Sequence, residues 1–137
     1  MNKILLDTNI ILDIALERRE FFEKSKELLL TLNKLNIPSY VTATTVTDIY
    51  YILKKSKGHQ LTISFLKNLF DFVDIVSVNK EVVIRALISE LTDFEDAIQN
   101  ECASQNDINI IITRNIADFK KSKLVIVTPS EFISQYS

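Results

Sequence analysis

The sequence predicts a three-layer α/β/α sandwich around a central, mainly parallel five-stranded sheet. Short apolar runs rich in β-branched residues recur along the chain, and amphipathic helical patterns separate them. One glycine and two prolines leave no room for a flexible linker. With 137 residues, 47% of them hydrophobic and 25% charged, the chain is expected to form a single globular domain over residues 1–137.

The N-terminal half begins with an apolar run, KILL, which predicts a buried strand that stops at Asp7. Asp7, Thr8 and Asn9 are all capping residue types, and the IILDIAL that follows has helical spacing. Gly58 marks a turn between two further helical patterns. The expected elements of this half are a strand over 3–6, helices over 10–16 and 21–35, a strand over 38–41, and helices over 42–55 and 60–72.

The C-terminal half contains the clearest strand, NIIIT, in which three successive isoleucines favour extended backbone. Asn79 and Asp93 are expected to begin helices, and Pro129 suits the first turn of a last one. The expected elements are a strand over 74–78, helices over 81–91 and 93–106, strands over 109–113 and 124–128, and a helix over 129–136.

Composition excludes several classes of protein. No run approaches the ~20 apolar residues of a membrane span, because Asp7 and Asp13 interrupt the most apolar N-terminal stretch. The same acids exclude the apolar core of a signal peptide, so a cytoplasmic location is expected. The single cysteine, Cys102, excludes an intramolecular disulfide and is expected to be a small buried helix residue. The net charge of −2 argues against nucleic-acid binding through bulk charge.

Acidic residues from separate segments are predicted to meet at one edge of the sheet. Asp7 follows the first strand, Asp118 follows the isoleucine-rich strand, and Asp48 lies early in the helix after the second strand. Asp96 lies in the first turn of the helix that runs back antiparallel to the isoleucine-rich strand. In open parallel sheets, sites lie beyond the carboxyl ends of the strands.

The stretch TDFEDAIQ, Thr92 to Gln99, has a simpler explanation in isolation. Asp93 with an acid three residues later resembles a helix cap, and acids in a first turn favour the helix dipole. Convergence with the other acids is what favours a site, because adjacent carboxylates repel unless a cation holds them. Oxygen-only ligation suits Mg²⁺ or Mn²⁺, and such ions assist attack on phosphodiesters.

Four motifs in this order, over the whole chain, resemble a PIN domain of the small bacterial VapC toxin kind: KILLDTNIILD, TVTDIYYIL, DFEDAIQNECA and ITRNIADF. The resemblance implies an Mg²⁺- or Mn²⁺-dependent ribonuclease that is the toxin of a toxin–antitoxin pair. Asp7, Asp48 and Asp96 match the first three acids of the family. The second is usually Glu, one methylene longer than Asp48. The acid after T-R is commonly Asp, where this chain has Asn115, with Asp118 three residues later.

These matches define the expected site. The catalytic set is Asp7, Asp48, Asp96 and Asp118, the metal ligands are Asp7, Asp96, Asp118 and Asn115, and the candidates for contact with substrate phosphate are Arg114 and Thr113. RNA is the expected substrate, and an antitoxin protein and a second copy of the chain are the expected partners.

Three other kinds of protein share parts of this pattern. A receiver domain would need paired acids after the first strand and a Lys after the last, where Thr128-Pro129 stands. An aspartyl phosphatase would need a second Asp at Asn9. A PIN-like module that binds RNA or protein without cutting, its metal site weakened at Asn115, remains open.

Overall fold

Five parallel strands form the centre of the molecule. A computed structural model describes residues 2–136, and in it the strands lie in the order β3-β2-β1-β4-β5 with every neighbouring pair parallel. The strands are β1 (Ile4–Leu6), β2 (Ser39–Thr42), β3 (Asp74–Val76), β4 (Ile110–Ile112) and β5 (Val125–Val127). The predicted α/β sandwich is confirmed.

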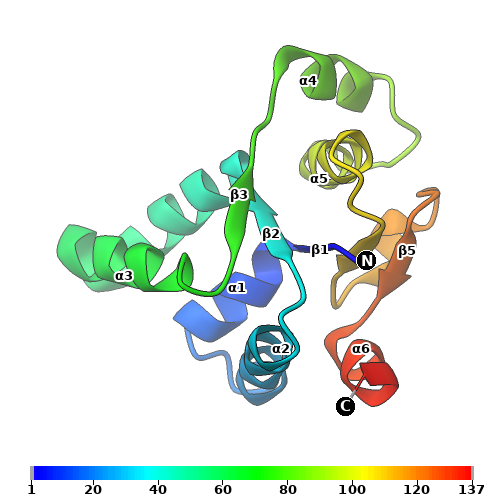
Figure 1. Cartoon of the computed structure of the whole chain (residues 1–137). Coiled ribbons are helices and arrows are strands. Elements are labelled where there is room, and N and C mark those ends of the chain that lie inside the picture. The colour runs from blue at the N-terminus through cyan, green and yellow to red at the C-terminus, as the bar shows by residue number, and fades with distance from the viewer. Residues whose placement is uncertain (1, 137) are drawn as a thin grey trace.

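Helices cover both faces of this sheet, as Figure 1 shows. They are α1 (Thr8–Ala15), α2 (Phe22–Lys34), α3 (Ala43–Leu69), α4 (Lys80–Leu87), α5 (Phe94–Gln105), the short 3₁₀ helix η1 (Ile116–Phe119) and α6 (Pro129–Tyr136). Ile4 and Leu6 point to the face covered by α1, α2, α3 and α6, whereas Leu5 points to the face covered by α4 and α5. Among the described helices, none is both long and apolar enough to cross a membrane.

Three local features differ from the predicted elements. Helix α3 runs on through Gly58, which breaks it with φ 78° and ψ 172°, so the predicted turn is a kink between two helical halves. Helix α4 ends at Leu87 rather than residue 91. There the Ser89 hydroxyl accepts a hydrogen bond from the Leu91 N–H and so competes with helix continuation. Helix η1 was not predicted, and it begins where the Asp118 N–H turns back to the Asn115 carbonyl.

The strand order places a reversal between β1 and β4, the two central strands of the predicted site. The chain leaves β1 toward β2 on one side, and β4 and β5 continue the sheet on the other. Such a reversal opens a crevice at the carboxyl ends of the strands. The Asp7 N–H donates to the Ile112 carbonyl at 3.0 Å, which ties the two strand ends together. The residues that directly follow β1 and β4, Asp7 and Thr113, therefore lie side by side.

Candidate active site at the carboxyl edge of the sheet

Asp7 is held from two sides directly after β1, where it is only 4% exposed. It occupies the N-cap position of α1, yet its side chain makes no capping bond. Instead, Gln99 Nε2 donates to Oδ1 at 2.9 Å and Thr113 Oγ1 donates to Oδ2 at 2.8 Å. Burial raises the pKa of Asp7 above its ordinary value of 3.8, and the two hydrogen bonds lower it in part. The carboxylate is thus fixed in orientation.

The first turn of α5 brings more acids to the same place. Asp93 caps the helix, and its Oδ1 accepts a hydrogen bond from the Asp96 N–H at 3.0 Å. The predicted cap is therefore present, and it leaves the Asp96 carboxylate free. Burial, and then the charges of Asp7, Asp93 and Asp118, raises the pKa of Asp96 from 3.8 to about 7. Capping and acid clustering are both properties of this one turn.

Glu95 belongs to the same cluster, although it is absent from the predicted site residues. Burial, and then a hydrogen bond and repulsion from Asp48, raises the pKa of Glu95 from 4.5 to about 8, while a hydrogen bond from Thr8 lowers it. The nearby Asp48 carboxylate therefore favours the protonated form of Glu95. The signal in the sequence was the second acid of TDFEDAIQ, but the resemblance to the family pointed to Asp96.

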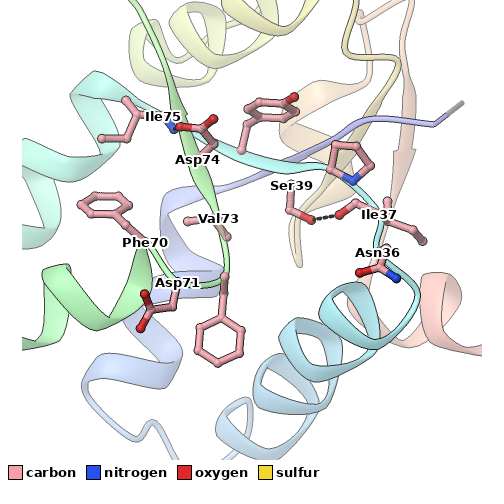
Figure 2. Close-up of a pocket in the computed structure, with 11 residues that line it drawn as sticks. Asn36, Ile37, Ser39, Phe70, Asp71, Val73, Asp74 and Ile75 are labelled. Carbon is pink, nitrogen blue, oxygen red and sulfur yellow. Dashed lines mark hydrogen bonds between the residues drawn. The ribbon is translucent and has the colours of Figure 1, made fainter.

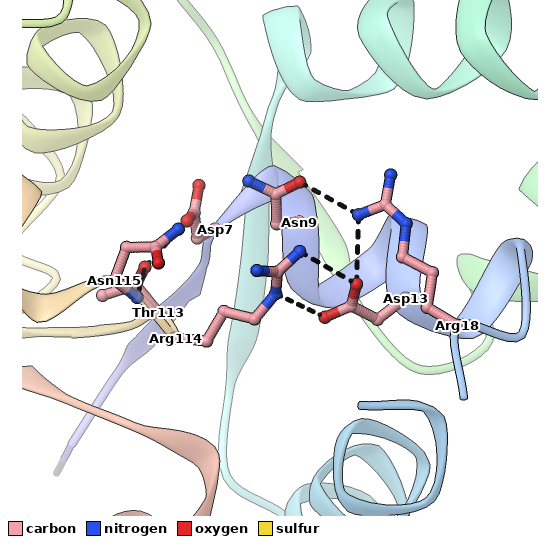
Figure 3. Close-up of polar contacts among 7 residues, drawn as sticks. All are labelled: Asp7, Asn9, Asp13, Arg18, Thr113, Arg114 and Asn115. Carbon is pink, nitrogen blue, oxygen red and sulfur yellow. Dashed lines mark hydrogen bonds and ion pairs between the residues drawn. The ribbon is translucent and has the colours of Figure 1, made fainter. Parts of the chain in front are cut away.

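The segment after β4 places its predicted residues differently. Thr113 is fully buried, donates to Asp7, and accepts a hydrogen bond from the Asn115 N–H at 3.0 Å. Arg114 turns its guanidinium to Asp13, with Nε 2.9 Å from Oδ2 and Nη2 3.3 Å from Oδ1 (Figure 3). The predicted contact of Thr113 and Arg114 with substrate phosphate stays a prediction, and in this structure both side chains bind acidic residues of the protein instead. Thr113 has no exposed surface, and Arg114 directs donors into the protein.

Five carboxylates and two amides line one hollow of about 230 Å³ beside β1 and β4. The lining residues come from the start of α1, the first turn of α5 and the segment after β4: Asp7, Asn9, Asp93, Glu95, Asp96, Asn115 and Asp118. Of the predicted site, the structure brings Asp7, Asp96, Asn115 and Asp118 together here. It places Asp48 against Glu95, outside this lining.

The chemistry of this hollow suits a hard divalent cation. Its side-chain donors are all oxygens or amides, with neither His nor Cys among the lining residues. Burial, and then repulsion from three neighbouring acids, raises the pKa of Asp96, and a bound cation would relieve that repulsion. Among the described residues, no three acidic, His or Cys side chains already form a closed ligand set. Mg²⁺ commonly keeps waters and recruits substrate phosphate, so an open set of protein ligands is compatible with it.

Gln99 is a second site residue that was not predicted. It is fully buried on α5, one helical turn after Asp96 and on the same side of the helix. Its Nε2 holds Asp7, and its Oε1 is buried without a hydrogen-bond partner among the described residues. Its spacing from Asp96 was the only signal in the sequence, and a glutamine one turn from an acid is common on solvated helix faces.

A larger hollow, about 640 Å³, lies at the opposite edge of the sheet, where the chain enters β2 and β3 (Figure 2). Its lining includes two acids, Asp71 and Asp74, and the half-exposed rings of Phe70 and Phe72. The acids of the carboxyl edge do not reach it. Volume alone therefore does not identify the site, and the convergence of acidic side chains favours the smaller hollow.

Comparison with known proteins finds relatives of this chain in sequence and in fold. A family model described as "PIN domain" matches residues 3–117. The chain is 24% identical to Ribonuclease VapC1 of Aquifex aeolicus (strain VF5) over 98% of this chain and 96% of that protein. Among solved structures, VapBC2 of Rickettsia felis bound to a promoter DNA fragment has a TM-score of 0.72 at 19% identity, covering 91% of this chain and 97% of that one. VapC20 of Mycobacterium tuberculosis, a sarcin-ricin loop cleaving toxin, has a TM-score of 0.69 at 15% identity, covering 90% and 97%. A toxin–antitoxin complex from Klebsiella pneumoniae gives 0.70 at 24%, covering 93% and 98%. At these identities the structural likeness shows a shared fold.

Proposed function

The chain belongs to the PIN domain family, and we propose that it is an endoribonuclease that uses Mg²⁺ or Mn²⁺ to hydrolyse RNA phosphodiester bonds. The observation that carries this proposal is the hollow at the carboxyl edge, where five carboxylates from three separate segments face one another. A cluster of this kind is unfavourable in a protein that does not bind a cation. The curated relative from Aquifex aeolicus is itself a ribonuclease by name.

Each group in the hollow has a distinct task in this proposal. Asp7, Asp96, Asp118 and Asn115 would hold the ion, which when bound supplies a nucleophilic hydroxide and stabilises charge on the phosphate. Gln99 and Thr113 keep both oxygens of Asp7 in place and so preorganise the ligand set. The Glu95 carboxyl, whose pKa burial and then Asp48 raise to about 8, can accept or return a proton beside the hollow.

We also propose that the protein is the toxin of a toxin–antitoxin pair in the cytoplasm and forms a homodimer. The structures it resembles include VapBC complexes and a complex named toxin–antitoxin. Co-expression with the product of a small neighbouring gene, followed by co-purification, tests the first proposal. Sedimentation of the isolated chain tests the second. A monomer at micromolar concentration would contradict the dimer without affecting the catalytic proposal.

Cleavage of labelled RNA tests the enzymatic proposal directly. Wild type should cut in Mn²⁺ and stop in EDTA, and the Asp7→Asn and Asp96→Asn variants should lose cleavage. Asp71→Asn is the matched control, because Asp71 is an exposed acid in the hollow at the opposite edge of the sheet. Cleavage that survives Asp7→Asn and Asp96→Asn would point to a contaminant or another site.

A non-cutting RNA- or protein-binding module is the second candidate. Asn115 brings an amide where an acid is common in the family, and Asp48 lies against Glu95 outside the lining of the hollow. Both features reduce the charge available to a metal. Retention of RNA by wild type in Mn²⁺ without any cleavage product would favour the binding module over the enzyme.

A further inference from the structure

Asp13 is a fully buried carboxylate on α1 that no step of the proposed reaction uses. Its side chain is 0% exposed. Arg18 Nη1 donates to Oδ1 at 3.1 Å, and Arg114 binds both oxygens, with Nε 2.9 Å from Oδ2 and Nη2 3.3 Å from Oδ1. A buried charge is tolerated only when it is paired and hydrogen-bonded, and this one has three donors from two arginines. Arg114 supplies two of the three.

The guanidinium of Arg114 is confined as well as paired. Its central carbon lies 4.1 Å from the centroid of the Phe21 ring, a separation typical of a cation stacked on an aromatic face. Figure 3 shows its nitrogens directed along the hydrogen bonds to Asp13. A two-pronged contact with a carboxylate fixes both the distance and the plane of the guanidinium. The backbone that carries Arg114 is therefore anchored to α1.

This anchor lies next to the groups that hold Asp7. Thr113 precedes Arg114, and its hydroxyl donates to Asp7 Oδ2 and accepts from the Asn115 N–H. Helix α1 thus binds the segment after β4 at two points: Asp7 at its N-terminus contacts Thr113, and Asp13, later in the helix, contacts Arg114. One attachment would let the segment pivot, whereas two fix its orientation.

We propose that Asp13 and Arg114 are positioning residues, a clamp that orients residues 113–115 so that Thr113 holds Asp7 and Asn115 faces the hollow. The inference deepens the proposed ribonuclease function, and the part of its test that measures RNA cleavage rests on that function. Loss of a hydrogen bond that orients a metal ligand without touching the metal commonly lowers metal affinity or activity 10- to 100-fold. The rival role for Arg114 is contact with an RNA phosphate. Asp13 separates the two roles, since a fully buried side chain cannot touch RNA.

The test compares Asp13→Asn, Arg114→Gln, Arg114→Lys and the double variant Asp13→Asn/Arg114→Gln with wild type. Arg18 stays in place, so Asp13 keeps a cationic partner when Arg114 is changed. Arg85→Gln is the matched control, because Arg85 makes an exposed ion pair with Glu81 on α4. Thermal unfolding verifies that each variant is folded under assay conditions. Three assays are used: steady-state kinetics for kcat and KM on RNA, calorimetry for Mn²⁺ affinity, and hydrogen exchange of the Asn115 backbone N–H in metal-free protein.

The clamp predicts that Asp13→Asn and Arg114→Gln lower kcat about 10- to 100-fold with little change in KM, weaken Mn²⁺ binding, and speed exchange at Asn115. Arg114→Lys should not rescue these effects, because a lysine lacks the planar fork. The double variant should have a kcat no lower than that of the less active single variant, because the two residues act as one unit. Arg85→Gln should match wild type.

Phosphate contact predicts a different pattern. Arg114→Gln would then raise KM for RNA and reduce the salt dependence of RNA binding, and Arg114→Lys would restore most of the RNA affinity. Asp13→Asn would leave the kinetics, the Mn²⁺ affinity and the hydrogen exchange unchanged. That pattern would overturn the clamp. The exchange measurement needs neither RNA nor metal. If wild type fails to cleave RNA, altered exchange at Asn115 still supports the clamp, and unchanged exchange in folded Asp13→Asn and Arg114→Gln rejects it.

Discussion

Replacing Asp96 with Asn is expected to stabilise the metal-free protein at pH 8 while it removes cleavage. Asp96 is half-buried and faces Asp7, Asp93 and Asp118, whose charges add to burial in raising its pKa to about 7. The substitution keeps the volume of the side chain and leaves the Asp93 cap intact, since that cap binds the backbone N–H of residue 96. Only the charge is lost, so the repulsion in the hollow should fall.

The expected gain follows from the rise in pKa. A change from 3.8 to about 7 would correspond to about 4 kcal/mol if the carboxylate were fully shielded from water. Because Asp96 is half-exposed, solvent screening reduces this value, and we expect roughly 1 to 2 kcal/mol. The penalty from a raised carboxyl pKa is absent below about pH 4, grows as pH rises and is complete above the folded pKa. The gain should therefore be largest at pH 8 and mostly gone at pH 4.5.

Urea unfolding in EDTA at these two pH values measures the gain. Asp71→Asn changes the net charge equally at the opposite edge of the sheet, and it should shift the free energy of unfolding by no more than about 0.5 kcal/mol. Saturating Mn²⁺ should reverse the order, since wild type gains binding energy that Asp96→Asn lacks. Equal stabilities of wild type and Asp96→Asn at pH 8 in EDTA would refute the claim that these carboxylates repel one another.

Other perturbations test the same geometry. Calorimetric Mn²⁺ affinity should rise between pH 6 and pH 9, because Asp96 and Glu95 must lose protons with pKa values of about 7 and about 8 to bind a cation; a flat profile would contradict this. Glu95→Gln should weaken Mn²⁺ binding more than Asp48→Asn, because of these two acids only Glu95 lines the hollow, and the opposite order would show that Asp48 acts on the cation more strongly than Glu95. Phe119→Ala should lower the free energy of unfolding by ~3–5 kcal/mol in urea, since its ring is 1% exposed beneath η1. A loss below 1 kcal/mol would show that η1 does not depend on this ring.

Local sequence patterns were sufficient for most of the fold. The isoleucine run at 110–112 and the apolar run before Asp7 predicted the two central strands, because buried parallel strands are continuously apolar. Gly58 predicted the break in α3, because only glycine adopts its backbone angles without strain. The end of α4 was missed, since apolar periodicity continues past Leu87 and the Ser89 side chain decides the stop.

The acidic residues of the site could be placed from topology, but their neighbours could not. Asp7, Asp96 and Asp118 were predicted at one edge because strand ends and helix starts meet there in a parallel sheet. The roles of Gln99 and Asp13 depend on which buried side chains touch across α1, α5 and the segment after β4. The spacing of residues in the sequence does not encode those contacts. Arg114 was expected to meet phosphate because it adjoins the acids, but its direction depends on a partner about 100 residues away in the sequence.

The direction of Arg114 keeps it out of the lining of the hollow, although its charge lowers the pKa of Asp7 in part. Among the described residues, those lining it include five carboxylates and none that is basic. A phosphate approaching this surface is repelled unless a divalent ion binds first. RNA affinity measured by fluorescence anisotropy should therefore be weaker for wild type than for Asp96→Asn in EDTA, and stronger in Mn²⁺. If the two proteins bind RNA equally in EDTA, the phosphates approach a different surface, and the acidic hollow does not control substrate binding.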